Sequence, residues 1–296
     1  QKITKRKRII VRLFVVSLIL SSLIFIKLLL NRMDKYIDEN GKSSMRAVIE
    51  QMQQTYDLQV NGYYSQLHLL EDSLLQEKEL SLETDKKFFE VWQKESESTL
   101  IFLQENGKAI TADGTKLRVD MPSKLLLDLR NGYNIGKLVC LDYEHTKKEG
   151  YLVAIPCEEY TINGETYTAI GTVYNHSRLD SMLKLKGYAG NAYLFMLDSD
   201  GNVTYTNQEE DIFFRNYSLL KHLLKAQAIT KNEMAILNKK LEKKEQGVEL
   251  LGKENRYYLG YCPIESNNSM LICIVKKGVV DNVLRDYQKT IVFETI

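Results

Sequence analysis

The side chains that could do chemistry in this chain of 296 residues are spread along it and form no recognised catalytic motif. The sequence contains no G-x-S-x-G, H-E-x-x-H, G-x-x-x-x-G-K-[ST] or G-x-G-x-x-G pattern. The histidines occur singly, at His68, His145, His176 and His222, as surface residues do. We therefore expect these residues to have no enzymatic activity, no bound metal and no cofactor.

One segment has the oxygen-rich composition of a calcium loop. Asp198-Ser199-Asp200-Gly201-Asn202 is followed by Glu209 at the twelfth position, but the glycine falls at the fourth position of the loop rather than the sixth. Asp200-Gly201 also lies between two strand-like runs, where a hairpin turn accounts for it. We predict a turn here.

The cysteines match no zinc pattern and form no C-x-x-C pair. Each lies in or beside an apolar, strand-like run, at Cys140, Cys157, Cys262 and Cys273. A disulfide within Cys140/Cys157 or within Cys262/Cys273 stays open, and small buried thiols are the favoured state.

Tyrosine is abundant, with 18 residues against three prolines and one tryptophan. Five tyrosines lie on or beside neighbouring strand-like runs: Tyr143, Tyr151, Tyr160, Tyr167 and Tyr174. Aromatic rings with a polar tip suit a pocket for a small polar ligand. They suit a half-buried sheet equally well, so both interpretations stay open.

The elements that would position these residues begin with a long helix. From Asp34 to Leu80 there is no proline, and apolar residues recur at steps of three and four, which is the spacing of one helix face. Gly41 and Gly62 each weaken such a helix by about 1 kcal/mol relative to alanine, so it could break near either. A stripe this long must pack on its own domains or on a second copy of the chain. Its members are Met45, Ile49, Met52, Tyr56, Val60, Tyr63, Leu67, Leu70 and Leu74.

After Thr99 the sequence changes, twice in succession, to short strands joined by tight turns. Turn pairs such as Asn163-Gly164 separate runs without helical periodicity. We predict strands at Leu100–Gln104, Lys116–Val119, Lys137–Tyr143, Tyr151–Glu159, Thr166–Tyr174, Asn191–Leu197, Asn202–Thr206, Gly247–Leu251, Arg256–Cys262 and Met270–Lys276. We predict helices at Ser123–Arg130, Ser177–Leu185, Asn216–Ala228, Lys231–Gln246 and from Gly278 onward.

The N-terminal residues have the composition of a membrane anchor. Ile9 to Leu30 gives 22 residues with charges only at Arg12 and Lys27, and a helix needs about 20 residues to cross a bilayer. The basic residues before it mark the N-terminus as cytoplasmic. No small-residue cleavage site follows, which favours an anchor over a cleaved signal peptide. The residues after Asn31 would then lie outside the cytoplasm.

Charge is distributed unevenly along the chain. Six of the 40 basic side chains lie within residues 1–12, which leaves 34 basic against 39 acidic side chains elsewhere. This mildly acidic part has no basic patch with interleaved aromatic residues, which argues against nucleic acid as a partner. Thr290–Ile296 favours the start of a second membrane helix, with an exposed tail as the alternative. Because the chain opens on Gln1 rather than Met, we expect its first residues to be missing.

Two linked segments resemble the junction of double Cache sensor domains. Ala169–Leu179 reads as the end of a strand and the start of a short helix, and Gly190–Val203 reads as a hairpin with a hydrophobic-D-x-D-G turn. In that family a strand ending in a D-I-S-like segment precedes such a hairpin. The long leading helix and the bracketing membrane segments also look similar, over roughly residues 34–289. The resemblance implies an extracytoplasmic receptor of two PAS-like modules, of which the membrane-distal one binds a small molecule.

The resemblance also implies positions for the ligand. Amino-acid-binding members of the family carry an R-x-W-Y segment ahead of a Y-x-D strand, and a final aspartate. This sequence has no R-x-W-Y, reads Cys140-Leu141-Asp142 at the Y-x-D position and has Asn175 at the final aspartate, so the ligand is left open. Asp142 could still bind an ammonium group through charge-assisted hydrogen bonds. We predict Asp142, Tyr151, Tyr174 and Asn175 as ligand-binding residues.

The predicted fold class is α+β, with a long N-terminal membrane-rooted helix followed by two tandem PAS-like (Cache) modules with antiparallel sheets. Its predicted parts are a basic cytoplasmic N-terminus (1–8), a transmembrane helix (9–30), a long extracytoplasmic helix (31–96), a membrane-distal module (97–185), a membrane-proximal module (186–277) and an exit helix that starts a second span (278–296). These parts predict the ligand-sensing region of a bacterial transmembrane signalling receptor of the histidine kinase, diguanylate cyclase or chemoreceptor type. Its expected partners are a small molecule, the lipid bilayer and a second copy bound through the long helix. The alternative is a membrane-tethered structural or assembly protein that binds a protein partner.

Overall fold

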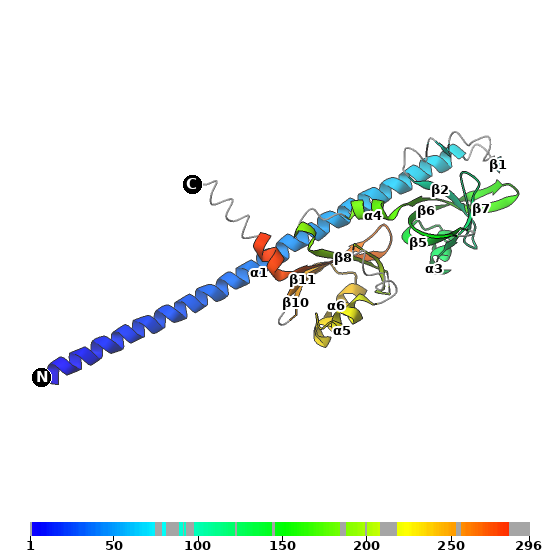
Figure 1. Ribbon diagram of the computed structural model, residues 1–296. Coiled ribbons are helices and arrows are strands. Elements are labelled where there is room, and N and C mark those ends of the chain that lie inside the picture. The colour runs from blue at the N-terminus through cyan, green and yellow to red at the C-terminus, as the bar shows by residue number, and fades with distance from the viewer. Residues whose placement is uncertain are drawn as a thin grey trace, which may run out of the picture.

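The structure, a computed structural model (Figure 1), describes residues 2–74, 79–80, 89–90, 92, 98–121, 123–143, 146–183, 188–198, 200–207, 218–252 and 256–283. Several predicted features lie outside these residues. They are Glu209 of the calcium-like segment, the last residues of the helix predicted at Ser177–Leu185, the first residues of the helix predicted at Asn216–Ala228, and the apolar segment Thr290–Ile296.

The predicted long helix is one continuous element, α1 (Lys2–Leu74), and the rest of the fold lies along it (Figure 1). Every member of the apolar stripe from Met45 to Leu74 is buried, with at most 8% of its surface exposed. The stripe packs on the two sheets of the same chain. Of the two predicted packing partners, the chain's own domains and a second copy, the structure contains the first. The helix also continues through Gly41 and Gly62 without a break.

The helix ends earlier than predicted. α1 stops at Leu74, and β1 (Glu79–Leu80) pairs in parallel with Thr161 and Ile162 of β6 (Thr146–Ile162). The helical prediction was therefore wrong at Glu79 and Leu80. Pairing with a neighbouring strand supplies their backbone with hydrogen-bond partners that the end of a helix lacks, and local periodicity does not reveal such a partner.

The first sheet has the strand order β1-β6-β5-β4-β3-β2-β7, and β6 pairs with β7 as well as with β5. Strands β2 to β7 therefore form a ring that closes on the long β6, and all of its pairings are antiparallel. Its strands are β2 (Thr99–Leu103), β3 (Lys108–Thr111), β4 (Lys116–Asp120), β5 (Ile135–Tyr143), β6 and β7 (Glu165–Tyr174). This sheet and α3 (Ser123–Arg130) are called the first module below.

Alternate residues of the ring point to its two faces, as in any strand. One set, which includes Ile101, Val119 and Leu152, packs with Leu125 and Leu129 of α3 in an apolar cluster of its own. The other set packs against α1. The sequence analysis missed β3, because four residues between two turns are too few to show an alternation.

The second sheet has the antiparallel order β10-β11-β12-β8-β9. Its strands are β8 (Ala192–Leu197), β9 (Val203–Thr206), β10 (Gly247–Leu251), β11 (Tyr257–Ile264) and β12 (Ser269–Lys276). One face packs on α1, and the other packs on α5 (Leu219–Lys225) and α6 (Lys231–Glu242). A capping box between Thr230 and Glu233 starts α6. The second sheet, α5 and α6 are called the second module.

The two modules lie one after the other along α1, and the N-terminal part of α1 projects beyond both (Figure 1). α4 (His176–Met182) and the short helix η1 (Tyr188–Gly190) connect the two sheets, and β12 leads directly into a helix at 277–283. In the part of the chain that the structure describes, no helix combines the length and hydropathy that a membrane crossing requires. All four cysteines are free thiols, as the favoured interpretation predicted. Cys262 and Cys273 are buried, as predicted, whereas Cys140 and Cys157 are half-buried.

Candidate functional site

Two of the four predicted ligand-binding residues are core residues. Tyr151 on β6 and Tyr174 on β7 are cross-strand partners, and neither is more than 2% exposed. The ring of Tyr174 stacks on Tyr63 of α1, with centroids 4.3 Å apart and an angle of 25° between the planes. Burial raises the pKa of Tyr174 to about 12, so its hydroxyl stays protonated. These tyrosines pack the first sheet against α1.

The other two predicted residues are at the surface with different partners. Asp142 lies near the end of β5, and its Oδ2 is 3.7 Å from Nζ of Lys147. It lines an open, charged groove of about 430 Å³ together with Lys116. Asn175 is the N-cap of α4, where its Oδ1 accepts a hydrogen bond from the Arg178 N–H at 3.1 Å. The structure thus brings Tyr151 and Tyr174 together in the core, and it leaves Asp142 and Asn175 outside it.

A larger polar cleft, of about 760 Å³, lies where the two modules meet α1. The end of α3 and the start of β5 line it from the first module, and the β8–β9 and β11–β12 turns line it from the second. Four carboxylates against one ammonium group give the cleft a negative potential. Its polar lining residues are Asn61, Tyr64, Asp128, Tyr133, Asn134, Lys137, Asp198, Asp200, Glu265, Ser266, Asn267 and Asn268.

One lining residue, Asn267, connects α1 to both modules. It lies in the β11–β12 turn and is 7% exposed. Its Nδ2 donates to Tyr56 Oη of α1 at 2.7 Å and to the Gly136 carbonyl of β5 at 3.0 Å. Tyr56 Oη is in turn hydrogen-bonded to Tyr151 Oη of β6. Among the described residues, the buried Oδ1 of Asn267 has no hydrogen-bond partner.

The same turn is also fixed to α1 by its neighbour Ser266. Asp57 Oδ1 accepts hydrogen bonds from Ser266 N–H at 3.2 Å and from Ser266 Oγ at 2.6 Å. Tyr64 Oη donates to the Ser266 carbonyl at 3.1 Å. These contacts hold the second module on α1, beside the first module. We call the set of Tyr56, Asp57, Tyr64, Gly136, Tyr151, Ser266 and Asn267 the three-way junction.

Glycine at position 136 is required by the close approach of two tyrosines. A Cβ there would lie 2.7 Å from Tyr151 Oη and 3.0 Å from Tyr64 Oη. Burial raises the pKa of Tyr56, Tyr64 and Tyr151 above the usual value, so these hydroxyls stay neutral. The junction and the cleft therefore offer neutral hydroxyls, amides and carboxylates, which are groups suited to binding a polar ligand.

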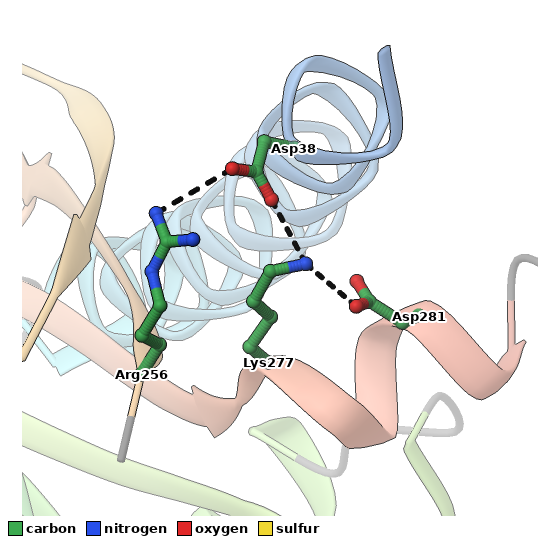
Figure 2. Close-up of polar contacts among 4 residues, drawn as sticks. All are labelled: Asp38, Arg256, Lys277 and Asp281. Carbon is green, nitrogen blue, oxygen red and sulfur yellow. Dashed lines mark hydrogen bonds and ion pairs between the residues drawn. The ribbon is translucent and has the colours of Figure 1, made fainter. Parts of the chain in front are cut away.

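A second polar cluster joins α1 to the helix at 277–283 (Figure 2). Lys277 Nζ lies 2.8 Å from Asp38 Oδ1 of α1 and 2.6 Å from Asp281 Oδ2. Arg256 Nη2, just before β11, lies 3.4 Å from Asp38 Oδ2. Burial lowers the pKa of Lys277, but its bonds to Asp281 and Asp38 outweigh burial and leave that pKa raised. We call these four residues the ionic cluster.

The calcium-like segment is a turn, as predicted. Asp198 Oδ1 accepts hydrogen bonds from the backbone N–H groups of Asp200 and Asn202, both at 2.9 Å, and Gly201 has a φ of 77°. β8 and β9 pair on either side of it. Over the residues described, no group of three or more His, Cys, Asp or Glu side chains could hold a metal ion.

The sequence analysis missed the three-way junction. Tyr56 was counted with the apolar stripe, which is correct for its ring but says nothing of its hydroxyl. Asn267-Asn268 between two apolar runs does signal a turn. That signal cannot show that the turn is buried against a helix more than 200 residues earlier in the chain.

Comparisons with known proteins place the fold. No protein-family model and no curated protein matches the chain. The ligand-binding domain of the Pseudomonas aeruginosa amino acid chemoreceptor PctB, in complex with L-Gln, is 15% identical with a TM-score of 0.53, over 78% of this chain and 89% of that one. The periplasmic sensory domain of the Campylobacter jejuni chemoreceptor Tlp1 is 12% identical with a TM-score of 0.51, over 81% and 95%.

At these identities the likeness shows the fold. The chain has the fold of extracytoplasmic sensory domains, with a long N-terminal helix and antiparallel sheets. This fold agrees with the resemblance to double Cache sensor domains, and the membrane-rooted part of the expected architecture stays a prediction.

Proposed function

We propose that the chain is the ligand-sensing region of a bacterial transmembrane signalling receptor of the histidine kinase, diguanylate cyclase or chemoreceptor type. The observation that carries this proposal is the three-way junction. There the buried side-chain amide of Asn267, in a turn of the second module, donates hydrogen bonds to Tyr56 of α1 and to the Gly136 carbonyl of the first sheet. A ligand that favours one arrangement of the modules would change these bonds and so act on α1. In this proposal residues 97–185 are the membrane-distal module and residues 186–277 the membrane-proximal one.

In this proposal α1 crosses the membrane at residues 9–30, and the modules lie outside the cytoplasm. The span rests on the sequence, because the described part of the chain contains no helix that meets the requirement for crossing. Seven large apolar side chains on this part of α1 are 51–63% exposed: Leu18, Leu20, Leu23, Ile24, Phe25, Ile26 and Leu28. They lie where α1 projects beyond both modules (Figure 1), and a bilayer would cover them. A second span would follow the helix at 277–283, where the sequence favours one from Thr290 to Ile296.

Reporter fusions within the Asn163-Gly164 turn test this topology. That turn joins β6 and β7 and has positive φ at both residues, and exposed turns of this kind tolerate insertion. Alkaline phosphatase inserted there should be active, and a fluorescent protein that requires the cytoplasm should be dark. The opposite pair of results would refute the receptor topology.

We place the ligand in the cleft between the modules and infer that it is a small polar molecule with a cationic group. The excess of carboxylates in the lining supports this choice, because carboxylates bind ammonium groups through charge-assisted hydrogen bonds. The similar domain of PctB is in complex with L-Gln, a molecule of this kind. The residues predicted from the sequence, Asp142, Tyr151, Tyr174 and Asn175, remain the alternative site.

Thermal unfolding of the chain with amino acids, amines, organic acids and nucleobases would find the ligand. Asp128→Asn and Glu265→Gln remove charge from the cleft, and Asp142→Asn is the matched control in the first module. Stabilisation lost in the two cleft variants and kept in Asp142→Asn supports the cleft, and the reverse supports the alternative site. If no small molecule stabilises the chain, the tethered assembly protein becomes the better interpretation.

We also propose that these residues perform no catalysis and that α1 pairs with a second copy. Leu58 and Leu69 are 74% and 67% exposed on the helix, on the side away from its buried stripe, and pairing would cover them. Analytical ultracentrifugation should give a dimer, and Leu58→Glu with Leu69→Glu should give a monomer. A monomeric wild-type chain would contradict the pairing.

A further inference from the structure

The outer face of the second sheet contains a cavity that the proposed function does not use. It measures about 300 Å³ and lies between β8, β11, β12 and the end of α5. Phe195, Leu259 and Ile274 project into it from three neighbouring strands. Tyr193, which is 39% exposed, and the half-buried Tyr257 also line the cavity.

The cavity has the size and lining of a small-molecule site. Protein interiors contain few voids larger than a water molecule, whereas ligand pockets of about 300–1,000 Å³ are mostly lined by apolar and aromatic side chains. Ala226 and Ala228 line it where α5 ends. Larger side chains at these two positions would reduce the space.

The charge at this cavity, that of Lys276, is opposite in sign to the net charge of the cleft. Lys276, the exposed last residue of β12, lies opposite Tyr257 in the strand register, and His222 of α5 also lines the cavity. Within the described part of the chain, no carboxylate lines the cavity and none forms an ion pair with Lys276. A ligand with an apolar body and one carboxylate complements both the walls and this charge.

We propose that this cavity binds a small monocarboxylate with an aryl or short aliphatic body, and that its carboxylate is held by Lys276. The site goes beyond the proposed function, because it lies on the outer face of the second module, away from the cleft between the modules, and selects the opposite charge. Lys276 directly precedes Lys277 of the ionic cluster. A ligand held there therefore lies one residue from the contact that holds the helix at 277–283 to α1.

Calorimetric titration of the whole chain in lipid nanodiscs tests the proposal with 4-phenylbutyrate as the probe. 4-Phenylbutanol and 4-phenylbutylamine are neutral and cationic probes with the same apolar body. We expect the acid to bind, the alcohol to bind about ten-fold more weakly and the amine to bind more weakly still, because only the acid can form a hydrogen bond between two charged groups with Lys276.

Variants separate the cavity from the cleft and from the surface. Lys276→Met should weaken acid binding about ten-fold, whereas Lys225→Met, which removes an exposed lysine of α5 outside the lining, should leave it unchanged. Ala228→Phe should abolish binding by filling the space, and Ala226→Leu is the milder variant if the first does not fold. Asp128→Asn in the cleft should have no effect.

Each of four results would overturn the proposal. They are no measurable binding of the acid, equal affinity for the acid and the amine, unchanged binding in Lys276→Met, and loss of binding in Asp128→Asn. The last would place the acid in the cleft. None of them bears on whether an amine or amino acid stabilises the chain through the cleft, so the two proposals can fail independently.

Discussion

Gly41 of α1 determines how closely the helix approaches the second sheet, and Gly62 supplies a matched control on the same helix. A Cβ at Gly41 would overlap Oη of Tyr258 and lie 2.6 Å from its Cζ, whereas a Cβ at Gly62 would meet nothing within 4 Å. Tyr258 is fully buried on β11, so its ring cannot turn into solvent. Gly41→Ala must therefore displace the helix or the tyrosine, and Gly62→Ala displaces nothing.

The two substitutions share one term and differ in another. Both gain about 1 kcal/mol of helix propensity, and for Gly62→Ala this gain is the whole expected change in the free energy of unfolding. In Gly41→Ala, overpacking subtracts about 1–3 kcal/mol, which leaves a net change between about zero and a loss of about 2 kcal/mol. For a chain of this size each kcal/mol moves Tm by about 2–4 °C.

Thermal unfolding followed by far-UV circular dichroism measures the difference. We expect Tm of Gly62→Ala to lie above that of the wild type and Tm of Gly41→Ala to lie at or below it. Adding Tyr258→Phe to Gly41→Ala removes the nearest atom, so part of the loss should be recovered while the contact with Cζ remains. Equal increases in Tm for the two glycine variants would refute the close packing of α1 on Tyr258.

Three further predictions follow from charge and burial. Lys277→Met leaves Asp38 and Asp281 without their shared cation, so the free energy of unfolding in urea should fall by about 1–2 kcal/mol at neutral pH. The pKa of Lys277 is raised in the folded state. This contribution to stability is therefore complete below about pH 10 and is lost as the pH rises through the folded-state pKa. A difference in unfolding free energy between wild type and Lys277→Met that persists in strong alkali would contradict this prediction. Burial raises the pKa of Cys262 to about 11 and that of Cys273 further, so iodoacetamide at about pH 8 should label them, by mass spectrometry, only after unfolding; rapid labelling of the folded chain would argue against their burial. Burial also raises the pKa of the junction tyrosines Tyr56, Tyr64 and Tyr151. Their contribution to stability is therefore lost as the pH rises above the unfolded-state pKa of about 10. In an alkaline titration, tyrosinate absorbance should rise in two steps, and the second step should coincide with loss of circular dichroism.

The sequence was sufficient to predict α1 and most of the strands, because their signals are local. The stripe from Met45 to Leu74 repeats at steps of three and four for eight turns of helix, and every member is buried. The Asn163-Gly164 turn has positive φ at both residues, as a two-residue hairpin requires. Such features depend on neighbours a few residues away, so periodicity and turn chemistry are enough to find them.

The closure of the first sheet could not be predicted, because it depends on pairs that are distant in sequence. β7 pairs with β6 and also with β2, more than 60 residues earlier, and β1 pairs with the far end of β6. Hydrophobic alternation tells which side chains share a face and leaves strand partners undetermined. The same limit applied to the site. Tyr151 was singled out for its ring and hydroxyl, and its partner Tyr56 lies 95 residues away.

The two polar clusters lie at different positions along α1, so this helix can link the ligand-dependent change at the three-way junction to the ionic cluster. Asp38 of the ionic cluster and Tyr56 of the three-way junction lie on the same helix, about 27 Å apart at 1.5 Å per residue. Between them Met45, Ile49 and Met52 are buried against the second sheet, so this stretch of helix cannot bend without disturbing close-packed side chains. A ligand that shifts Tyr56 must therefore either break its bond to Asn267 or carry the helix with it, and in the second case Asp38 moves relative to Lys277.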